Sequence, residues 1–155
     1  MKIKVREIVD GCLPIRSGAH KSDCFDLFLA EDVKLKKGEL GVFSLGVSME
    51  IPKGMSGRAY LRSSTPVKHN VYMANHVGII DSVYCGNDDN WRVELVALKA
   101  TTIPKGTRIC QFELVPSQFA TIYQKLKWLF SSSLTIQKVD KLTSKNRGGL
   151  GTTGK

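Results

Sequence analysis

Short apolar segments separated by turn residues make up most of this chain. Valine, isoleucine, phenylalanine and tyrosine are frequent inside the segments, while glycine and proline lie between them. Two turns share the pattern IPKG, at 51–54 and at 103–106, with proline early and glycine late. This arrangement predicts an all-β sandwich or jelly roll rather than β-α-β units. The predicted strands are residues 2–8, 24–30, 40–51, 57–61, 77–80, 91–98, 108–115 and 120–124.

Two segments depart from the strand pattern. One short helix is expected around Pro66–His69, although the proline and its β-branched neighbours oppose it. Residues 125–137 lie between the similar phrases YQK (123–125) and IQK (136–138), so they are interpreted as an insertion. An extra hairpin or loop is favoured there over a partner-binding element, and the core is expected to resume at Val139.

Composition narrows the class of protein. A length of 155 residues with 42% hydrophobic and 24% charged content is that of one soluble globular domain. The net charge of +9 favours an anionic partner such as a phosphorylated metabolite, but the cations are dispersed, so no direct nucleic-acid contact is expected. The four cysteines have no metal-binding spacing and are interpreted as reduced thiols of a cytoplasmic protein. The first residues lack the apolar core of a signal peptide, and residues 128–137 are too short and polar to span a membrane.

The most informative stretch is HVGIIDSVYCG at 76–86. An apolar run ends in one carboxylate, Asp81, and an aromatic residue, Tyr84, follows three positions later in a turn bounded by glycine. Such a strand and turn could present an acid and a flat ring to one small ligand. The alternative is an edge hairpin with a solvated aspartate.

The end of the chain differs in kind from the rest. Residues 145–155 hold four glycines, two threonines and three cations, and they are expected to form a mobile tail after a core of residues 1–144. Backbone N–H groups, hydroxyls and a guanidinium suit a polyphosphate. The alternative is a polar terminus without a ligand.

Five segments in order resemble the five motifs of the trimeric dUTP pyrophosphatases, in the form found in Gram-positive bacteria and their phages. They are DCFDLF (23–28), GRAYLRSS (57–64), GIIDSVYCG (78–86), KGTRICQ (105–111) and RGGLGTTG (147–154). The resemblance implies a β-clip jelly roll, a homotrimer with shared active sites, Mg²⁺ as cofactor, and hydrolysis of dUTP to dUMP and pyrophosphate.

The resemblance also implies how the nucleoside is held. Asp81 would orient the water that attacks the α-phosphorus and would accept the 3′-hydroxyl of the sugar. Tyr84 would pack against the deoxyribose and exclude a 2′-hydroxyl. Asn75 and the backbone of the following hairpin, with Gly78 and Ile80, would recognise uracil.

The phosphates would be held by the remaining motifs. Ser63, Ser64 and Gln111 resemble phosphate ligands, and Arg62 resembles the cation that steadies both the catalytic acid and the phosphates. The tail would close over the γ-phosphate with Arg147, Gly149, Leu150, Gly151, Thr152 and Thr153. Mg²⁺ would be held mainly by the triphosphate and water, with Asp26 as a candidate ligand through water.

Three positions depart from the family pattern. Val83 replaces a frequent acid, and Thr107 replaces the usual aspartate before Arg108, so that ion pair is expected to be missing. Leu150 replaces a phenylalanine that stacks on uracil. Because the loop at 86–91 is long and polar, Trp91 is predicted to cover the base from a flexible loop; the alternative is a tryptophan of the core or an interface.

Two other functions fit the same fold. A dCTP deaminase would need a glutamate on the strand after the acidic turn, and Glu94 lies in roughly that region. A nucleotide-sensing regulatory protein that binds a repressor would use 125–137 as its interaction element. Products formed from dUTP and from dCTP separate these alternatives.

Overall fold

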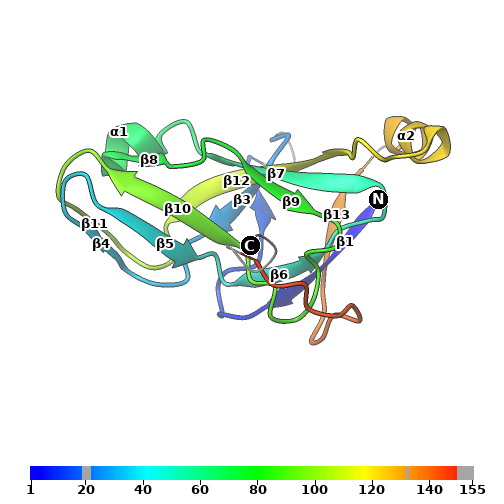
Figure 1. The fold of residues 1–155 in the computed structure, drawn as a ribbon, viewed down its shortest axis with the longest axis horizontal. Helices are drawn as coiled ribbons and strands as arrows, with labels where there is room; N and C mark the ends of the chain where they lie inside the picture. Colours follow the sequence, from blue (N-terminus) through cyan, green and yellow to red (C-terminus); the bar gives the residue numbers. More distant parts are fainter. Residues whose placement is uncertain (19–21, 132, 150–155) are drawn as a thin grey trace, which may run out of the picture.

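The computed structural model describes residues 1–18, 22–131 and 133–149 (Figure 1). Within these residues the chain is mainly strands with two short helices, which confirms the predicted all-β class. The strands are β1 (Lys2–Glu7), β2 (Ile15–Arg16), β3 (Phe25–Phe28), β4 (Val33–Leu35), β5 (Leu40–Ser44), β6 (Val47–Glu50), β7 (Met55–Leu61), β8 (Val71–Met73), β9 (Gly78–Asp81), β10 (Arg92–Ala97), β11 (Thr101–Ile103), β12 (Arg108–Pro116) and β13 (Thr135–Lys138). The helices are α1 (Thr65–His69) and α2 (Ile122–Leu129).

The strands pair into small sheets that pack around a shared core. The largest sheet has the order β2-β3-β12-β7-β9, with β12 at its centre. The sheets β13-β1-β6 and β5-β10-β8 and the pair β11-β4 complete the described part. Alternate residues of the strands enter the core, which contains Leu27 of β3, Phe112 of β12 and Leu95 of β10.

Most predicted strands are confirmed, with one division. The segment 40–51 is two strands, β5 and β6, because Gly46 turns the chain between them with a left-handed φ of 68°. A Cβ atom at Gly46 would also lie 2.7 Å from the Cys12 sulfur. The sequence pattern missed β2, β4, β8, β11 and β13, which have only two to four residues each.

The predicted short helix is confirmed as α1. Pro66 lies in its first turn, where a backbone N–H would have no acceptor within the helix. Asn70 ends the helix with a φ of 53° and donates its N–H to the Pro66 carbonyl. The Thr65 hydroxyl donates to the Ile109 carbonyl at 2.9 Å, which fixes α1 against β12.

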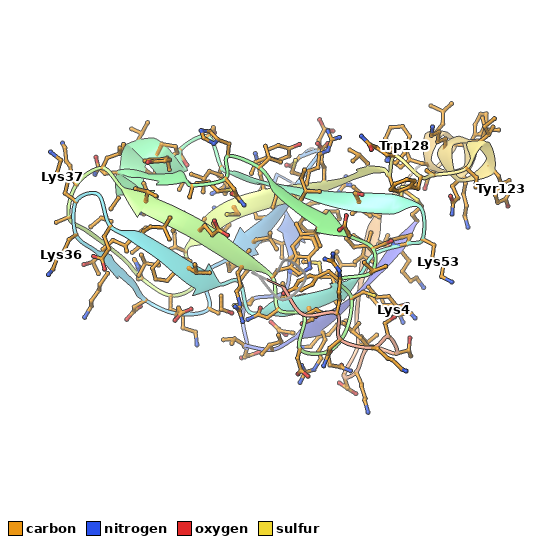
Figure 2. All side chains as sticks on the ribbon, in the orientation of Figure 1. Lys4, Lys36, Lys37, Lys53, Tyr123 and Trp128 are labelled. Carbon is orange, nitrogen blue, oxygen red and sulfur yellow. The ribbon has the colours of Figure 1, made fainter. Side chains whose placement is uncertain are left out.

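Residues 120–124, predicted as a strand, instead lead into α2, which begins at Ile122 after the N-cap Thr121. Thr121 and Gln124 form a capping box in which each side chain accepts the other residue's backbone N–H. The hairpin or loop favoured for 125–137 is therefore wrong for residues 125–129, which are helical. Helix α2 buries none of its residues and lies at one end of the molecule (Figure 1). Figure 2 places Trp128 on the side of α2 nearer the strands and Tyr123 on the far side.

The end of that segment forms a strand of a sheet. Strand β13 pairs in parallel with β1, from Lys2 opposite Thr135 to Val5 opposite Lys138. Lys138 donates a hydrogen bond to Glu7, and this bond lowers the pKa of Glu7. Ile136 of β13 also packs against the core, so contacts with the core begin before Val139.

The four cysteines are free thiols. Neither helix in the described part of the chain has the length and apolar character needed to cross a membrane.

Candidate active site

A cavity of about 200 Å³ opens where β7, β9 and β10 meet the end of the described chain. Its walls combine apolar, amide, acidic and basic side chains. The lining residues are Ala59, Asn75, Gly78, Ile79, Ile80, Asp81, Tyr84, Asn90, Trp91, Arg92, Glu94, Arg147 and Gly149. The structure thus brings together eight of the predicted site residues: Asn75, Gly78, Ile80, Asp81, Tyr84, Trp91, Arg147 and Gly149.

Strand β9 and the turn after it position the Asp81 carboxylate and the Tyr84 ring in the cavity. Strand β9 pairs antiparallel with β7, so Asp81 lies opposite Ser56 at the edge of the five-stranded sheet. The N–H of Tyr84 donates to the Asp81 carbonyl at 2.9 Å, which closes a tight turn. The Tyr84 hydroxyl donates to the Asn90 carbonyl at 2.8 Å, and burial raises the pKa of this phenol. The ring is therefore fixed beside the carboxylate.

The carboxylate of Asp81 is exposed in the cavity. Its side chain is 55% exposed, and Arg147 Nη1 lies 3.7 Å from its Oδ2 atom. This separation is longer than a hydrogen bond, so the guanidinium steadies the negative charge without occupying both oxygens. The carboxylate keeps lone pairs available for a water molecule or a hydroxyl.

The hairpin between β8 and β9 supplies the polar edge of the cavity. His76 has a φ of 59° and donates its N–H to the Met73 carbonyl at 3.0 Å. Val77 donates to the Asn75 carbonyl at 2.6 Å. These bonds hold Asn75 at an exposed position on the lining of the cavity.

The prediction that Trp91 covers a ligand from a flexible loop is wrong in this structure. Trp91 is only 2% exposed and packs edge-on against Phe112, with ring centroids 5.1 Å apart. It forms an inner wall of the cavity. Its Nε1 atom and Asn90 Oδ1 are buried without a hydrogen-bond partner among the described residues.

The loop before Trp91 is anchored rather than free. Asp89 is 1% exposed and accepts the N–H groups of Gly86, Arg147 and Gly148 at 2.8–2.9 Å. Burial by itself raises the pKa of Asp89, but the donated N–H groups outweigh it and hold the pKa below its ordinary value. The start of the segment predicted as a mobile tail is therefore docked on its own chain up to Gly149. The predictions for Leu150, Gly151, Thr152 and Thr153 lie outside the described residues.

A second polar cluster surrounds Asp26 on β3. This carboxylate is 3% exposed and receives Arg62 Nε at 2.9 Å, Arg108 Nη1 at 3.2 Å and the Ser17 hydroxyl. Within this chain Arg62 therefore contacts Asp26 and not Asp81. Arg108 does find a carboxylate partner, although Thr107 precedes it. Because its oxygens are buried and taken, Asp26 does not fit the predicted role of a magnesium ligand through water.

The predicted phosphate ligands lie near this second cluster. Gln111 of β12 is opposite both Asp26 and Tyr60, while Ser63 and Ser64 follow β7 and precede α1. None of them lines the cavity. Asp81 is opposite Ser56, and Arg62 comes six residues later along extended chain, a span of about 20 Å. Within one chain the predicted phosphate ligands and the cavity around Asp81 therefore lie apart.

Sequence reasoning missed part of the cavity wall. Arg92 and Glu94 of β10 both line it, and Glu94 was considered only for deamination. Asp89 was not singled out, because nothing local in the loop indicates that it accepts N–H groups from residues 147 and 148. The described residues contain no cluster of three or more metal-ligating side chains.

Comparison with known proteins agrees with these observations. The sequence model of the dUTPase family matches residues 14–147. The SPbeta prophage-derived deoxyuridine 5′-triphosphate nucleotidohydrolase YosS of Bacillus subtilis (strain 168) is 36% identical over 154 residues, which cover 99% of each chain. The deoxyuridine 5′-triphosphate nucleotidohydrolase of Rickettsia felis is 32% identical over 158 residues, covering 99% of this chain and 96% of that protein.

Solved structures agree on the fold. The dUTPase of Streptococcus mutans superposes with a TM-score of 0.65 at 25% identity, covering 72% of this chain and 91% of that one. A mutant dUTPase from phage phi11 of S. aureus, which coordinates a structural Mg(II) ion, gives 0.66 at 21% identity, covering 77% and 94%. The paired acid and ring of the cavity, the five ordered motifs and these matches place the chain in the dUTPase family.

Proposed function

We propose that this chain hydrolyses dUTP to dUMP and pyrophosphate. One observation carries the assignment within the family: Asp81 and Tyr84 converge on one cavity, with the Arg147 guanidinium 3.7 Å from the acid. The exposed carboxylate would orient a water molecule and take its proton as the oxygen attacks the α-phosphorus. Pyrophosphate then leaves in line with the attack, and Arg147 balances the charge that develops on the phosphoryl oxygens.

The cavity would hold the nucleoside part of the substrate. Tyr84 is fixed by its hydroxyl bond to Asn90, so its ring would lie rigidly under the deoxyribose and exclude a 2′-hydroxyl. Asn75 and the backbone at Gly78 and Ile80 would recognise the uracil edge. Trp91 would contribute as a buried wall of this cavity and not as a lid.

We further propose that the active enzyme is a homotrimer whose sites are shared. A cavity of about 200 Å³ is small for a nucleoside triphosphate, since ligand pockets usually measure about 300–1,000 Å³. Arg62, Ser63 and Ser64 follow the far end of β7, and Gln111 lies next to that end on β12, so they are too distant to reach phosphates beside Asp81 of the same chain. A neighbouring copy would bring its own second cluster to this cavity and complete the phosphate site.

Magnesium is proposed to accompany the substrate. Mg²⁺ commonly binds through phosphate oxygens and water with few protein ligands, and the described residues offer it no prepared cage. The ion would draw charge from the triphosphate. The residues of this chain would position the water, the sugar and the phosphates. A cytoplasmic location is proposed, where dUTP is available.

The test is to incubate the purified protein with dUTP, dCTP, UTP and dTTP in the presence of Mg²⁺. The expected products are dUMP and pyrophosphate from dUTP alone. Release of ammonia from dCTP would instead establish deamination and give Glu94 of the cavity wall a catalytic role. If none of the four nucleotides is changed, the proposed function is wrong.

A further inference from the structure

The contacts of Asp89 join the acidic turn to the end of the chain. Its carboxylate is buried and accepts the backbone N–H groups of Gly86 at 2.8 Å, Arg147 at 2.9 Å and Gly148 at 2.8 Å. Gly86 belongs to the turn that carries Asp81 and Tyr84, and the other two donors belong to the fifth motif. One side chain therefore links the two elements that meet over the cavity.

The absence of a side chain at Gly86 lets the backbone at Asn146 pack directly against it. A Cβ atom at this position would lie 2.5 Å from the Asn146 backbone nitrogen and closer still to the Asn146 Cα atom. Real side chains do not approach backbone so closely, and the three nearest atoms all belong to Asn146. A parallel bridge between Gly86 and Ser144 continues this contact. Glycine is thus needed here for the docking of the terminal segment.

After this contact with Gly86, residues 147–149 lie next to Tyr84 and Asp81 of the same chain. A Cβ atom at Gly149 would lie 3.0 Å from the Tyr84 ring. Arg147 Nη1 reaches to 3.7 Å from Asp81 Oδ2. Asp88 and Asn146 add a reciprocal pair of hydrogen bonds beside Asp89.

We propose that Asp89 is a positioning residue that fixes the terminal segment in cis, so that Arg147 serves the Asp81 of its own chain. This inference rests on the proposed function, because Arg147 acts only when phosphates occupy the site. Asp89 does not touch the reacting atoms. It acts by holding the Arg147 and Gly148 backbone, from which the guanidinium extends toward Asp81.

The first experiment compares three full-length variants: Asp89→Asn, Gly86→Ala and the control Asp140→Asn. The control removes one exposed carboxylate near the terminal segment without touching the contacts of Asp89. Hydrogen exchange at the Gly148 amide should accelerate in the first two variants and stay unchanged in the control. Their kcat for dUTP should fall roughly 10–100-fold, since a displaced catalytic group costs about this factor. Unchanged exchange and kcat in Asp89→Asn would overturn the proposal.

The second experiment distinguishes cis from trans closure without altering Asp89. Chains carrying Asp81→Asn and chains carrying Arg147→Ala are co-expressed with different tags and purified through both tags. With cis closure no site in the mixed assembly has both groups, so activity stays at the level of the separate variants. Restored turnover would show that the segment crosses to a neighbour and would overturn the proposal while leaving dUTP hydrolysis intact.

A control mixture shows whether missing turnover reflects cis closure or the absence of a site shared between chains. Chains with Asp81→Asn are combined with chains carrying Gln111→Ala, whose phosphate ligand is proposed to act across the interface. Turnover should return in this mixture. If it does not, the shared-site proposal is wrong, and the Gly148 exchange measurement still decides whether Asp89 holds the segment.

Discussion

Asp81 and Asp26 lie on the same five-stranded sheet and have opposite surroundings. Asp81 ends an edge strand, is 55% exposed and has Arg147 at 3.7 Å. Asp26 lies on β3 beside the central strand, is 3% exposed and is held by two guanidinium groups and a hydroxyl. Both belong to family motifs, yet only one has oxygens free for a substrate.

The difference shows that the position of a carboxylate in the fold decides whether it stabilises the structure or acts on a substrate. A carboxylate whose oxygens already accept from several donors cannot also orient water with them. An exposed carboxylate with one distant cation keeps that capacity. The two aspartates should therefore separate in experiment, Asp81 affecting turnover and Asp26 affecting folding.

The largest effect is expected from Asp81→Asn. The amide keeps the shape of the side chain but cannot take a proton from water, so kcat for dUTP should fall by about 10²–10⁴-fold. Because the side chain is exposed, the melting temperature should stay near that of the wild type. Steady-state kinetics and thermal unfolding check both. Near-normal kcat would remove Asp81 from the role of base.

A large loss of stability is expected from Trp91→Ala. The side chain is buried against Phe112, and removal of a buried tryptophan costs about 3–5 kcal/mol of unfolding free energy. Denaturant unfolding measures the change, with Trp128→Ala on the exposed helix α2 as the control. A stable Trp91→Ala protein with weakened binding of a dUTP analogue would restore the lid interpretation.

Asp26→Ala should cost somewhat less than the tryptophan. It leaves Arg62 and Arg108 without their buried partner, and breaking such a pair costs about 3 kcal/mol. Both arginines are partly exposed, which limits the loss. Asp23→Ala, at an exposed position three residues earlier, is the matched control and should leave unfolding unchanged. Equal stability of the two variants would contradict the structural role of Asp26.

The smallest effect concerns pH. The pKa of Asp89 is lowered in the folded chain, so its stabilising contribution is present above the unfolded value and is lost as pH falls through the folded value. The terminal segment should stay docked between about pH 5 and 8 and be released only below about pH 4. The chemical shift of the Gly148 amide follows this change. A transition near pH 6 would mean that another group controls docking.

Local signals in the sequence predicted a large part of the molecule. The apolar run before Asp81, the tight turn to Tyr84 and the proline at the start of α1 all act within a few residues, so their geometry follows from backbone preferences. The same holds for most strands. The segment that became α2 carries two local signals, because its β-branched residues favour a strand and its Thr121–Gln124 capping box favours the helix that forms.

Contacts between distant residues were decided only by the tertiary structure. Asp26 meets Arg62 and Arg108 because β3 and β7 both pair with β12. Asp89 receives the N–H groups of residues 147 and 148 because β13 returns the chain to β1. The sequence alone determined which residues carry the chemistry and the class of fold. Burial and strand pairing decided which carboxylate stays free, since these depend on neighbours that sequence spacing does not specify.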